Sequence, residues 1–209
     1  MTRVHRVAIG VAAAVALAAV AVALHVTAAT AGAPFAHARL ALADGTRIGT
    51  VRFWDDRRHG ATVVKVKLAV PPAATAPGAF HGFHVHANDD PANGTGCVAD
   101  PRQPSSTWFI SADGHLKHDP AEMHGGHAGD LPILYLDADG RAEARFTVDR
   151  IVPRELHGKA VILHAGADNF GNVPVGTAPD QYTANSPAAT TKTMNTGNAG
   201  DRIACGVVG

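Results

Sequence analysis

Residues 61–70 read Ala-Thr-Val-Val-Lys-Val-Lys-Leu-Ala-Val, and apolar side chains occupy every second position from 64 to 70. Lys65 and Lys67 lie between these positions and would face the other way. Successive side chains of a strand point to opposite faces, so this period of two predicts a half-buried β-strand. An amphipathic helix would instead repeat its apolar residues every three or four positions.

Similar patterns extend in both directions along the chain. Upstream, Asp44-Gly45 is a turn signal that interrupts an extended stretch at residues 39–53. Downstream, further strands are predicted at residues 80–86, 133–136, 142–148 and 159–164, with a hairpin loop at 137–140. No amphipathic helix pattern stands out. Short strands separated by turns predict an all-β fold, an antiparallel β-sandwich or flattened barrel.

Two long stretches break the strand pattern. Residues 90–130 are rich in Gly, Pro, Asp and His, and residues 169–201 are polar with few core-forming side chains. Loops of this length in a compact domain are usually functional or disordered. The first contains ligand-type residues and the second ends beside Arg202, so we expect both to be functional loops.

The N-terminus has the order of a secretory signal peptide. Arg3 and Arg6 precede an uncharged apolar run at residues 7–24, and Ala29-Thr30-Ala31 offers a cleavage site. We therefore expect residues 1–31 to be removed on export, to the periplasm, the cell envelope or the outside of the cell. An uncleaved anchor is the alternative, because eighteen apolar residues reach the length needed to span a membrane.

Cleavage would leave residues 32–209 as a single domain with no membrane span. It would remove two of the 18 basic residues and no acidic ones, so 16 Lys and Arg would face 18 Asp and Glu. This balance gives no electrostatic reason to bind nucleic acid. Cys97 and Cys205 belong to an exported chain, where oxidation is allowed. One disulfide is the simplest interpretation, with two free thiols or a thiol ligand as alternatives.

Two histidines stand two positions apart in the predicted strand at residues 80–86. Because side chains alternate along a strand, His84 and His86 face the same way, about 7 Å apart along it. Val85 points into the opposite layer. Imidazole suits copper and zinc, and Cu(II) accepts a tetragonal set of nitrogens. The pair therefore predicts half of a copper site.

A second group of ligand-type residues lies in the first long loop. It contains four histidines and an aspartate within sixteen residues: His115, His118, His124, His127 and Asp130. Nitrogen and oxygen ligands of this kind suit tetrahedral zinc. A solvated, unselective histidine-rich tract is the alternative. The glycines at 125, 126 and 129 favour a site, since they let the backbone turn tightly enough to bring ligands together.

A further histidine ends the buried run at residues 160–163. His164 would be held rigidly at a strand end, and Asp168 follows four residues later. A lone histidine in such a place is more often structural than a ligand. A carboxylate near metal-bound histidines, however, commonly accepts their second N–H and fixes the ring direction. We therefore interpret His164 as a copper ligand.

Five motifs in this order resemble the exported bacterial copper–zinc superoxide dismutases. They are His81-Gly82-Phe83-His84-Val85-His86, Ser111-Ala112-Asp113-Gly114-His115, His127-Ala128-Gly129-Asp130-Leu131, Leu163-His164-Ala165-Gly166-Ala167-Asp168 and the C-terminal residues 197–209. The resemblance runs from about Arg39 to the C-terminus. It implies a Greek-key β-sandwich that converts superoxide to oxygen and hydrogen peroxide and protects the exported compartment.

The resemblance also implies roles for single residues. Copper would be held by His84, His86, His115 and His164, and zinc by His115, His124, His127 and Asp130. His115 would bridge the two metals, and Asp168 would accept a hydrogen bond from one ligand of each. Arg202 would attract the substrate anion, and Cys97 and Cys205 would form the internal disulfide of the family.

One departure from the family pattern leaves the zinc ligands open. Only Gly125 and Gly126 separate His124 from His127, whereas most members have a longer stretch there. Either both histidines reach one ion from a tight turn, or His118 replaces one of them. Some relatives function with copper alone. Family members form homodimers through differing surfaces or stay monomeric, so a homodimer is one of two open states.

Two other classes of protein compete with the enzyme. An exported copper-binding module for sequestration or delivery would need the pair His84 and His86, but neither a rigid His164 nor Arg202. A purely structural sandwich would use its metals for stability. Neither class explains the whole set of motifs.

Overall fold

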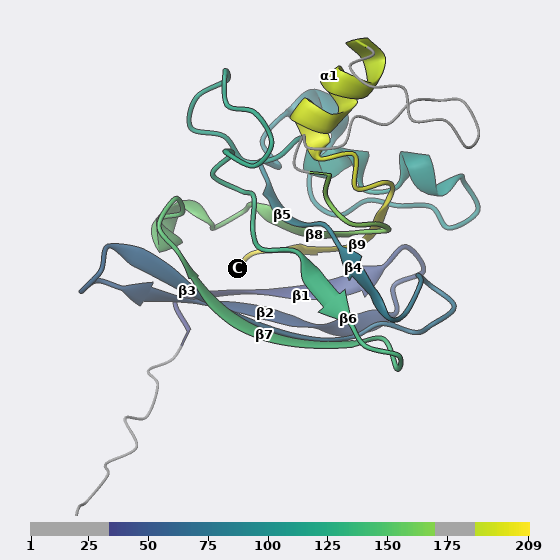
Figure 1. Cartoon of the computed structure of the whole chain (residues 1–209), viewed down its shortest axis with the longest axis horizontal. Helices are drawn as coiled ribbons and strands as arrows, with labels where there is room; N and C mark the ends of the chain where they lie inside the picture. Colours follow the sequence, from purple (N-terminus) through teal and green to yellow (C-terminus); the bar gives the residue numbers. More distant parts are fainter. Residues whose placement is uncertain (1–33, 170–186) are drawn as a thin grey trace, which may run out of the picture. The chain divides into compact units, whose positions relative to one another are not determined.

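The computed structural model describes residues 34–169 and 187–209, which form a seven-stranded antiparallel sheet and a smaller two-stranded one (Figure 1). The order in the larger sheet is β5-β8-β9-β1-β2-β3-β7, and β4 pairs with β6 in the smaller. The strands are β1 (Ala36–Leu42), β2 (Arg47–Asp56), β3 (Ala61–Ala69), β4 (Ala79–His81), β5 (Phe83–His86), β6 (Leu134–Leu136), β7 (Arg141–Val148), β8 (Ala160–His164) and β9 (Arg202–Val207).

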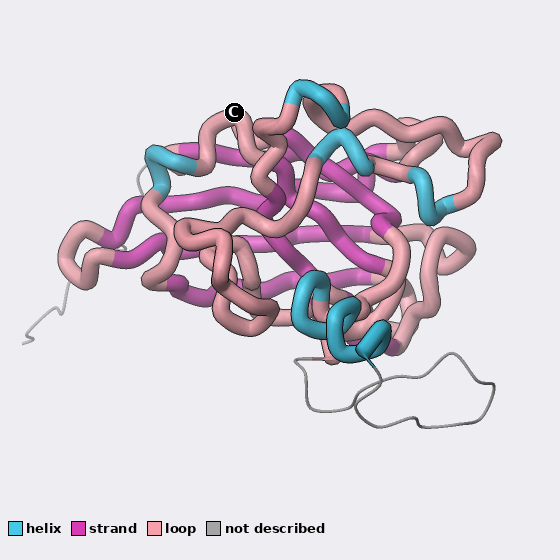
Figure 2. Tube along the Cα trace, turned by 90° about the horizontal axis from the view of Figure 1, so that it is seen from above, coloured by secondary structure: helices cyan, strands magenta, loops and turns pink. Residues whose placement is uncertain are grey.

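Helical elements in the described residues are short. They comprise four 3₁₀ turns and one α-helix: η1 (Pro91–Asn93), η2 (Ser105–Thr107), η3 (Ile110–Ala112), η4 (Pro153–Glu155) and α1 (Pro187–Thr196). Figure 2 shows the strands with the loops and helical turns grouped around them. The all-β prediction is therefore confirmed for the described part of the chain.

The period of two in β3 sorts its side chains as the sequence predicts. Val64 and Val66 are fully buried, whereas Lys67 is exposed and Lys65 half-buried. The buried side packs into the larger of two hydrophobic clusters, which also contains Phe83 and Val85 from β5, at the far end of the sheet order. The two ends of the sheet thus share one core, because the sheet curls around it.

The predicted strand at residues 80–86 is two strands in two different sheets. Gly82 separates β4, which pairs with β6, from β5, which pairs with β8. A Cβ at residue 82 would stand 2.6 Å from Asp168 Oδ1 and 2.7 Å from the Cβ of Ala199. The chain can pass between the sheets here because glycine leaves room for this close approach.

The prediction that the strands on either side of residues 137–140 pair with each other is also wrong. The turn exists, and Asp137 accepts hydrogen bonds from the backbone N–H groups of Asp139 and Arg141. However, β6 pairs with β4, and β7 pairs with β3 in the larger sheet. The turn therefore connects the two sheets instead of closing a two-stranded hairpin.

A helix that the sequence analysis did not predict lies in the second long loop. α1 ends at Thr196, and the N–H of the following Gly197 donates to the carbonyl of Thr193, which is itself buried. The helical sequence is rich in threonine, which has a modest helix propensity and leaves no amphipathic stripe. Residues 170–186 of this loop lie outside the described residues.

The predicted signal peptide at residues 1–31 also lies outside the described residues. Among residues 34–169 and 187–209, the structure contains no helix long and apolar enough to cross a membrane.

Candidate metal centre

Four histidines from three separate segments meet beside β5. His84 and His86 face one side of this edge strand, His164 ends the neighbouring β8, and His115 forms an isolated β-bridge with His86. One ring nitrogen of each lies within 4.8 Å of the others. Metal–nitrogen bonds of about 2 Å put opposite nitrogens of one ion about 4 Å apart. The four rings are therefore close enough to share one metal ion.

Three of these four rings are oriented by a hydrogen bond at the other nitrogen. His84 Nε2 donates to Asp168 Oδ2 at 3.0 Å, and His86 Nδ1 donates to the carbonyl of Asp113 at 2.8 Å. His164 Nδ1 donates to the carbonyl of Gly200 at 3.1 Å. Such bonds fix the tautomer of a metal-binding histidine and leave the opposite nitrogen with a lone pair.

The opposite nitrogens are buried and have no hydrogen-bond partner among the described residues. These atoms are His84 Nδ1, His86 Nε2, His115 Nε2 and His164 Nε2. A buried polar atom without a partner is costly and calls for an explanation, such as a bound ion. A metal ion held by all four would satisfy them at once, so the donor set fits the copper that the sequence predicts.

Burial keeps these imidazoles neutral. It lowers the pKa of His115 from the usual 6.5 to about 3 and that of His164 to about 4. Burial also places the pKa of His86 well below its usual value, and neighbouring His115 and Arg202 lower it further. At neutral pH the lone pairs of the rings are therefore available to a metal ion.

A second donor set shares His115 with the first. His115 Nδ1 lies 2.8 Å from Asp130 Oδ1 and 3.1 Å from His127 Nδ1, and His127 Nδ1 lies 3.2 Å from the same Asp130 oxygen. Adjacent ligands of a tetrahedral ion with bonds of about 2.0–2.1 Å are about 3.3 Å apart. The three atoms thus have the spacing of one face of a zinc tetrahedron.

His124 approaches the same place. A group of donors within 4.8 Å of one another contains His115, His124 and Asp130, and also His84. We assign His84 to the first set, because its Nε2 is bonded to Asp168. The tight turn at Gly125 and Gly126 thus brings His124 and His127 to the same carboxylate. His118 instead pairs with Glu155 at 3.1 Å, half-exposed and outside both sets.

Asp168 lies between the two donor sets. Its Oδ2 accepts from His84 Nε2 at 3.0 Å, and its Oδ1 lies 3.6 Å from His124 Nε2. Burial raises the pKa of this carboxyl, but the adjacent imidazoles of His124 and His84 outweigh burial and lower it to about 2. Gly197, at φ +64, leaves space for this arrangement, because a Cβ there would lie 2.5 Å from the His124 ring.

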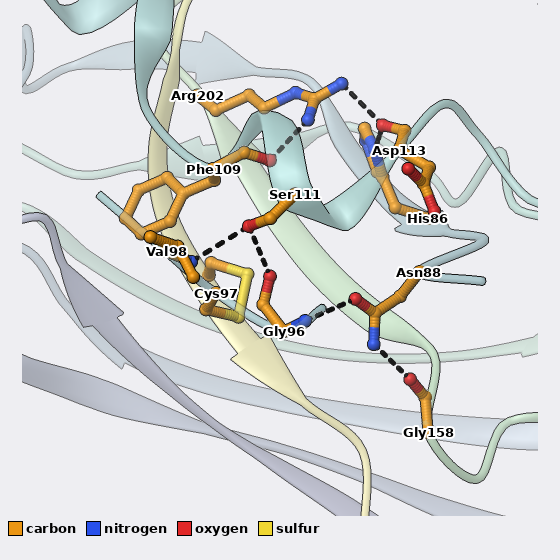
Figure 3. The surroundings of a disulfide bond; sticks show 11 residues. His86, Asn88, Gly96, Cys97, Val98, Phe109, Ser111, Asp113, Gly158 and Arg202 are labelled. Atoms are coloured by element: carbon orange, nitrogen blue, oxygen red, sulfur yellow. Dashed lines mark hydrogen bonds between the residues drawn. A yellow bond between two sulfur atoms is a disulfide. The ribbon is translucent and has the colours of Figure 1, made fainter. Parts of the chain in front are cut away.

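Arg202 stands beside the first donor set at the start of β9. Its guanidinium donates from Nη1 to the carbonyl of Phe109 at 2.5 Å and from Nη2 to the carbonyl of Asp113 at 2.6 Å. The carbonyl of Asp113 also accepts from His86, so one backbone oxygen joins Arg202 to a histidine of the first set (Figure 3). The cation is held by neutral carbonyls, and its pKa is lowered by burial and raised by the nearby Asp113 carboxylate.

A disulfide supports this region. Cys97 and Cys205 are bonded, as predicted, with their Cα atoms 5.6 Å apart. Next to the bridge, Ser111 Oγ donates to the carbonyl of Gly96 and accepts from the N–H of Val98 (Figure 3). The bridge therefore ties the loop that contains Phe109 and Asp113 to the strand that contains Arg202.

Several contacts of the site involve backbone groups that have no sequence signal. The carbonyls of Phe109 and Asp113 hold Arg202, and the carbonyl of Met194 in α1 accepts from the N–H of His124 at 2.6 Å. Backbone oxygens occur in every residue, so the sequence contains no signal that singles them out.

The chain matches known proteins along most of its length. The family model described as copper/zinc superoxide dismutase (SODC) matches residues 47–208. The Cu-Zn superoxide dismutase of Mycolicibacterium paratuberculosis is 36% identical over 191 residues, covering 87% of this chain and 77% of that protein. That of Photobacterium leiognathi is 27% identical over 173 residues, 80% of this chain and 82% of its own.

Two solved structures also match most of the chain. The clock protein EA4 matches with a TM-score of 0.57 at 25% identity, covering 84% of this chain and 94% of its own. A double mutant of a SOD-like protein from Bacillus subtilis matches with a TM-score of 0.53 at 25% identity, over 81% and 94%. With the family model spanning most of the described residues, the chain belongs to the copper/zinc superoxide dismutase family.

Proposed function

We propose that this chain is a superoxide dismutase that holds copper and zinc side by side. His84, His86, His115 and His164 would hold copper, and His115, His124, His127 and Asp130 would hold zinc. The observation that carries the proposal is the position of His115. This residue is part of the first donor set and its Nε2 is buried without a partner among the described residues, while its Nδ1 lies 2.8 Å from Asp130 in the second set. In this proposal His115 would contribute one nitrogen to each donor set.

When bound, copper would supply the one-electron chemistry that converts two superoxide ions and two protons to oxygen and hydrogen peroxide. The residues of the chain prepare this reaction. The bonds from His84, His86 and His164 to their acceptors hold the rings in place before substrate arrives. Such preorganisation avoids a cost of reorientation during the reaction.

Arg202 would attract the substrate, which is a small anion. Its guanidinium is half-buried and held beside His86 by two carbonyls. A cation focused in a site with low-dielectric walls can raise the rate of anion capture by roughly 10 to 10³. This fixed cation favours a catalyst over a copper carrier, which needs no anion at its metal.

The test compares wild-type protein with His164→Ala. We expect the purified wild type to contain one copper and one zinc and to consume superoxide, because both donor sets are complete. His164→Ala should lose most of its copper affinity and turnover while keeping zinc, because His164 belongs only to the first set. Tight copper binding by the wild type without turnover would contradict the proposal and favour a carrier.

We also propose that the protein is exported after cleavage of residues 1–31, leaving the domain at residues 32–209 in the periplasm, the cell envelope or outside. The N-terminal pattern and the disulfide support this, because disulfides persist in oxidising compartments. The intact mass of the protein from producing cells tests the cleavage. A homodimer stays a prediction, which light scattering of the purified protein tests.

A further inference from the structure

Two residues on either side of η3 have unusual backbone conformations. Phe109 has φ 57 and Asp113 has φ 62, in the half of the map that favours glycine. The ψ of Asp113 is −157, which also takes it out of the left-handed helical region that aspartate tolerates. Such conformations persist only where their surroundings enforce them, and they concentrate at functional sites.

The carbonyls of these two residues are the two acceptors of Arg202. Phe109 accepts from Nη1, and Asp113 accepts from Nη2 and also from His86 Nδ1. Figure 3 shows η3 between them, with the guanidinium reaching both carbonyls. The two unusual conformations therefore produce the arrangement that holds Arg202 beside the first donor set.

The side chain of Asp113 explains how its conformation is enforced. Its Oδ2 accepts from the N–H of Asp89 at 2.7 Å and of Asp90 at 2.8 Å, and its Oδ1 accepts from Asn93 Nδ2 at 2.9 Å. Aspartate in an ordinary turn bonds the backbone about two residues further on. Asp113 instead reaches back 20 to 24 residues, to the segment that follows His86.

We propose that Asp113 is a positioning residue for anion binding. Its carboxylate clamps residue 113 to the 89–93 segment, and this clamp aims the Asp113 carbonyl at Arg202 and His86. The anion is superoxide if the function proposed above is correct, but the clamp does not depend on it. Asp113 touches neither the metal nor the substrate and acts through the direction of its carbonyl.

Two substitutions distinguish the loss of the Asp113 carboxylate from the loss of the backbone conformation at residue 113. Asp113→Ala removes the clamp and leaves a residue that disfavours φ 62, so the carbonyl should turn away from Arg202. Asp113→Gly removes the same clamp but adopts φ 62 readily, so the carbonyl can still reach Arg202. Simple loss of charge or of three hydrogen bonds would affect both variants equally.

The first measurement does not require turnover. NMR of the purified full chain, kept reduced with ascorbate so that any copper is diamagnetic, follows the guanidinium N–H signals of Arg202. We expect these signals to be distinct in wild type and Asp113→Gly, and averaged by rotation in Asp113→Ala. The amides of Asp89 and Asp90 should exchange with solvent faster in both variants, because both lose the carboxylate.

The second measurement is azide binding to the copper-loaded protein. We expect Asp113→Ala to raise the azide Kd about tenfold, equivalent to about 1.4 kcal/mol. Asp113→Gly should remain within about threefold of wild type. In an Arg202→Ala background, Asp113→Ala should change azide affinity less than about twofold, because the effect passes through Arg202.

Three results would overturn the inference. One is an unchanged Arg202 spectrum in Asp113→Ala. Another is an equal loss of azide affinity in the Gly and Ala variants, and the third is the full tenfold loss in the Arg202→Ala background. A wild type that neither binds copper nor consumes superoxide would contradict the proposed function instead, while the NMR comparison would still decide the role of Asp113.

Discussion

At the scale of single residues, the side chains of the candidate site use their two polar atoms for different contacts. His84, His86 and His164 each give one nitrogen to a hydrogen bond and leave the other buried and unpartnered within the described part of the chain. Asp168 uses one oxygen for His84 and directs the other toward His124. Loss of such an outer partner typically costs 10–100-fold in metal affinity or activity.

The proposed role of Arg202 in attracting the substrate anion can be tested by a single substitution. We expect Arg202→Ala to lower kcat/KM for superoxide by roughly tenfold or more and to flatten its dependence on ionic strength. The copper content should stay the same, because Arg202 binds carbonyls and no donor nitrogen. Stopped-flow rates at several salt concentrations, with metal analysis, check this. Unchanged rates would remove Arg202 from the mechanism.

At the scale of elements, the sequence predicted most strands because burial on one face produces a local period of two. It failed at residues 80–86, where that period continues through Gly82 although the chain changes sheets. It also failed at α1. Contacts from other segments stabilise this helix, including the bond from the Asn169 side chain to Thr193 and the bond from the His124 N–H to Met194.

The disulfide between Cys97 and Cys205 is expected to stabilise the fold and to support the loop beside Arg202. It closes a loop across 108 residues of sequence, so replacing both Cys97 and Cys205 by serine should cost about 4–5 kcal/mol in the chain-entropy model. kcat/KM should fall too, because the residues on either side of Cys97 hold the loop that positions Arg202: Ser111 Oγ donates to the carbonyl of Gly96 and accepts from the N–H of Val98.

Urea unfolding and superoxide assays measure both effects. A reductant should destabilise wild type by a similar amount and leave the double variant unchanged, which separates the bridge from the serine substitutions. Equal stability of wild type and double variant would show that the bridge contributes nothing to folding.

At the scale of the whole molecule, the buried imidazoles make the stability of the metal-free protein depend on pH. The pKa of His115 is about 3 and that of His164 about 4 in the folded state, against 6.5 when exposed. Between pH 6.5 and about 4 the unfolded chain therefore binds protons that the folded chain does not. The free energy of unfolding of the metal-free protein should therefore fall as the pH drops below 6.5. The fall should be up to about 1.4 kcal/mol for each such histidine and each pH unit.

Urea unfolding of the metal-free protein at pH 7.5, 6 and 5 would check this, since the midpoint should decrease at each step. A His115→Gln variant should show a weaker decrease, because glutamine does not titrate. A midpoint independent of pH would mean that these imidazoles are not buried in the metal-free protein.

The all-β class and the ligand chemistry of the site could be predicted from the amino-acid sequence alone. Both are local: a period of two spans a few residues, and imidazole or carboxylate ligands are recognisable wherever they occur. The packing of distant segments was needed to learn which nitrogen of each histidine of the first donor set is left without a partner among the described residues, that His124 and not His118 lies at Asp130, and that backbone carbonyls hold Arg202. These depend on how segments far apart in the chain pack together, and ring orientation or carbonyl direction is a property of that packing.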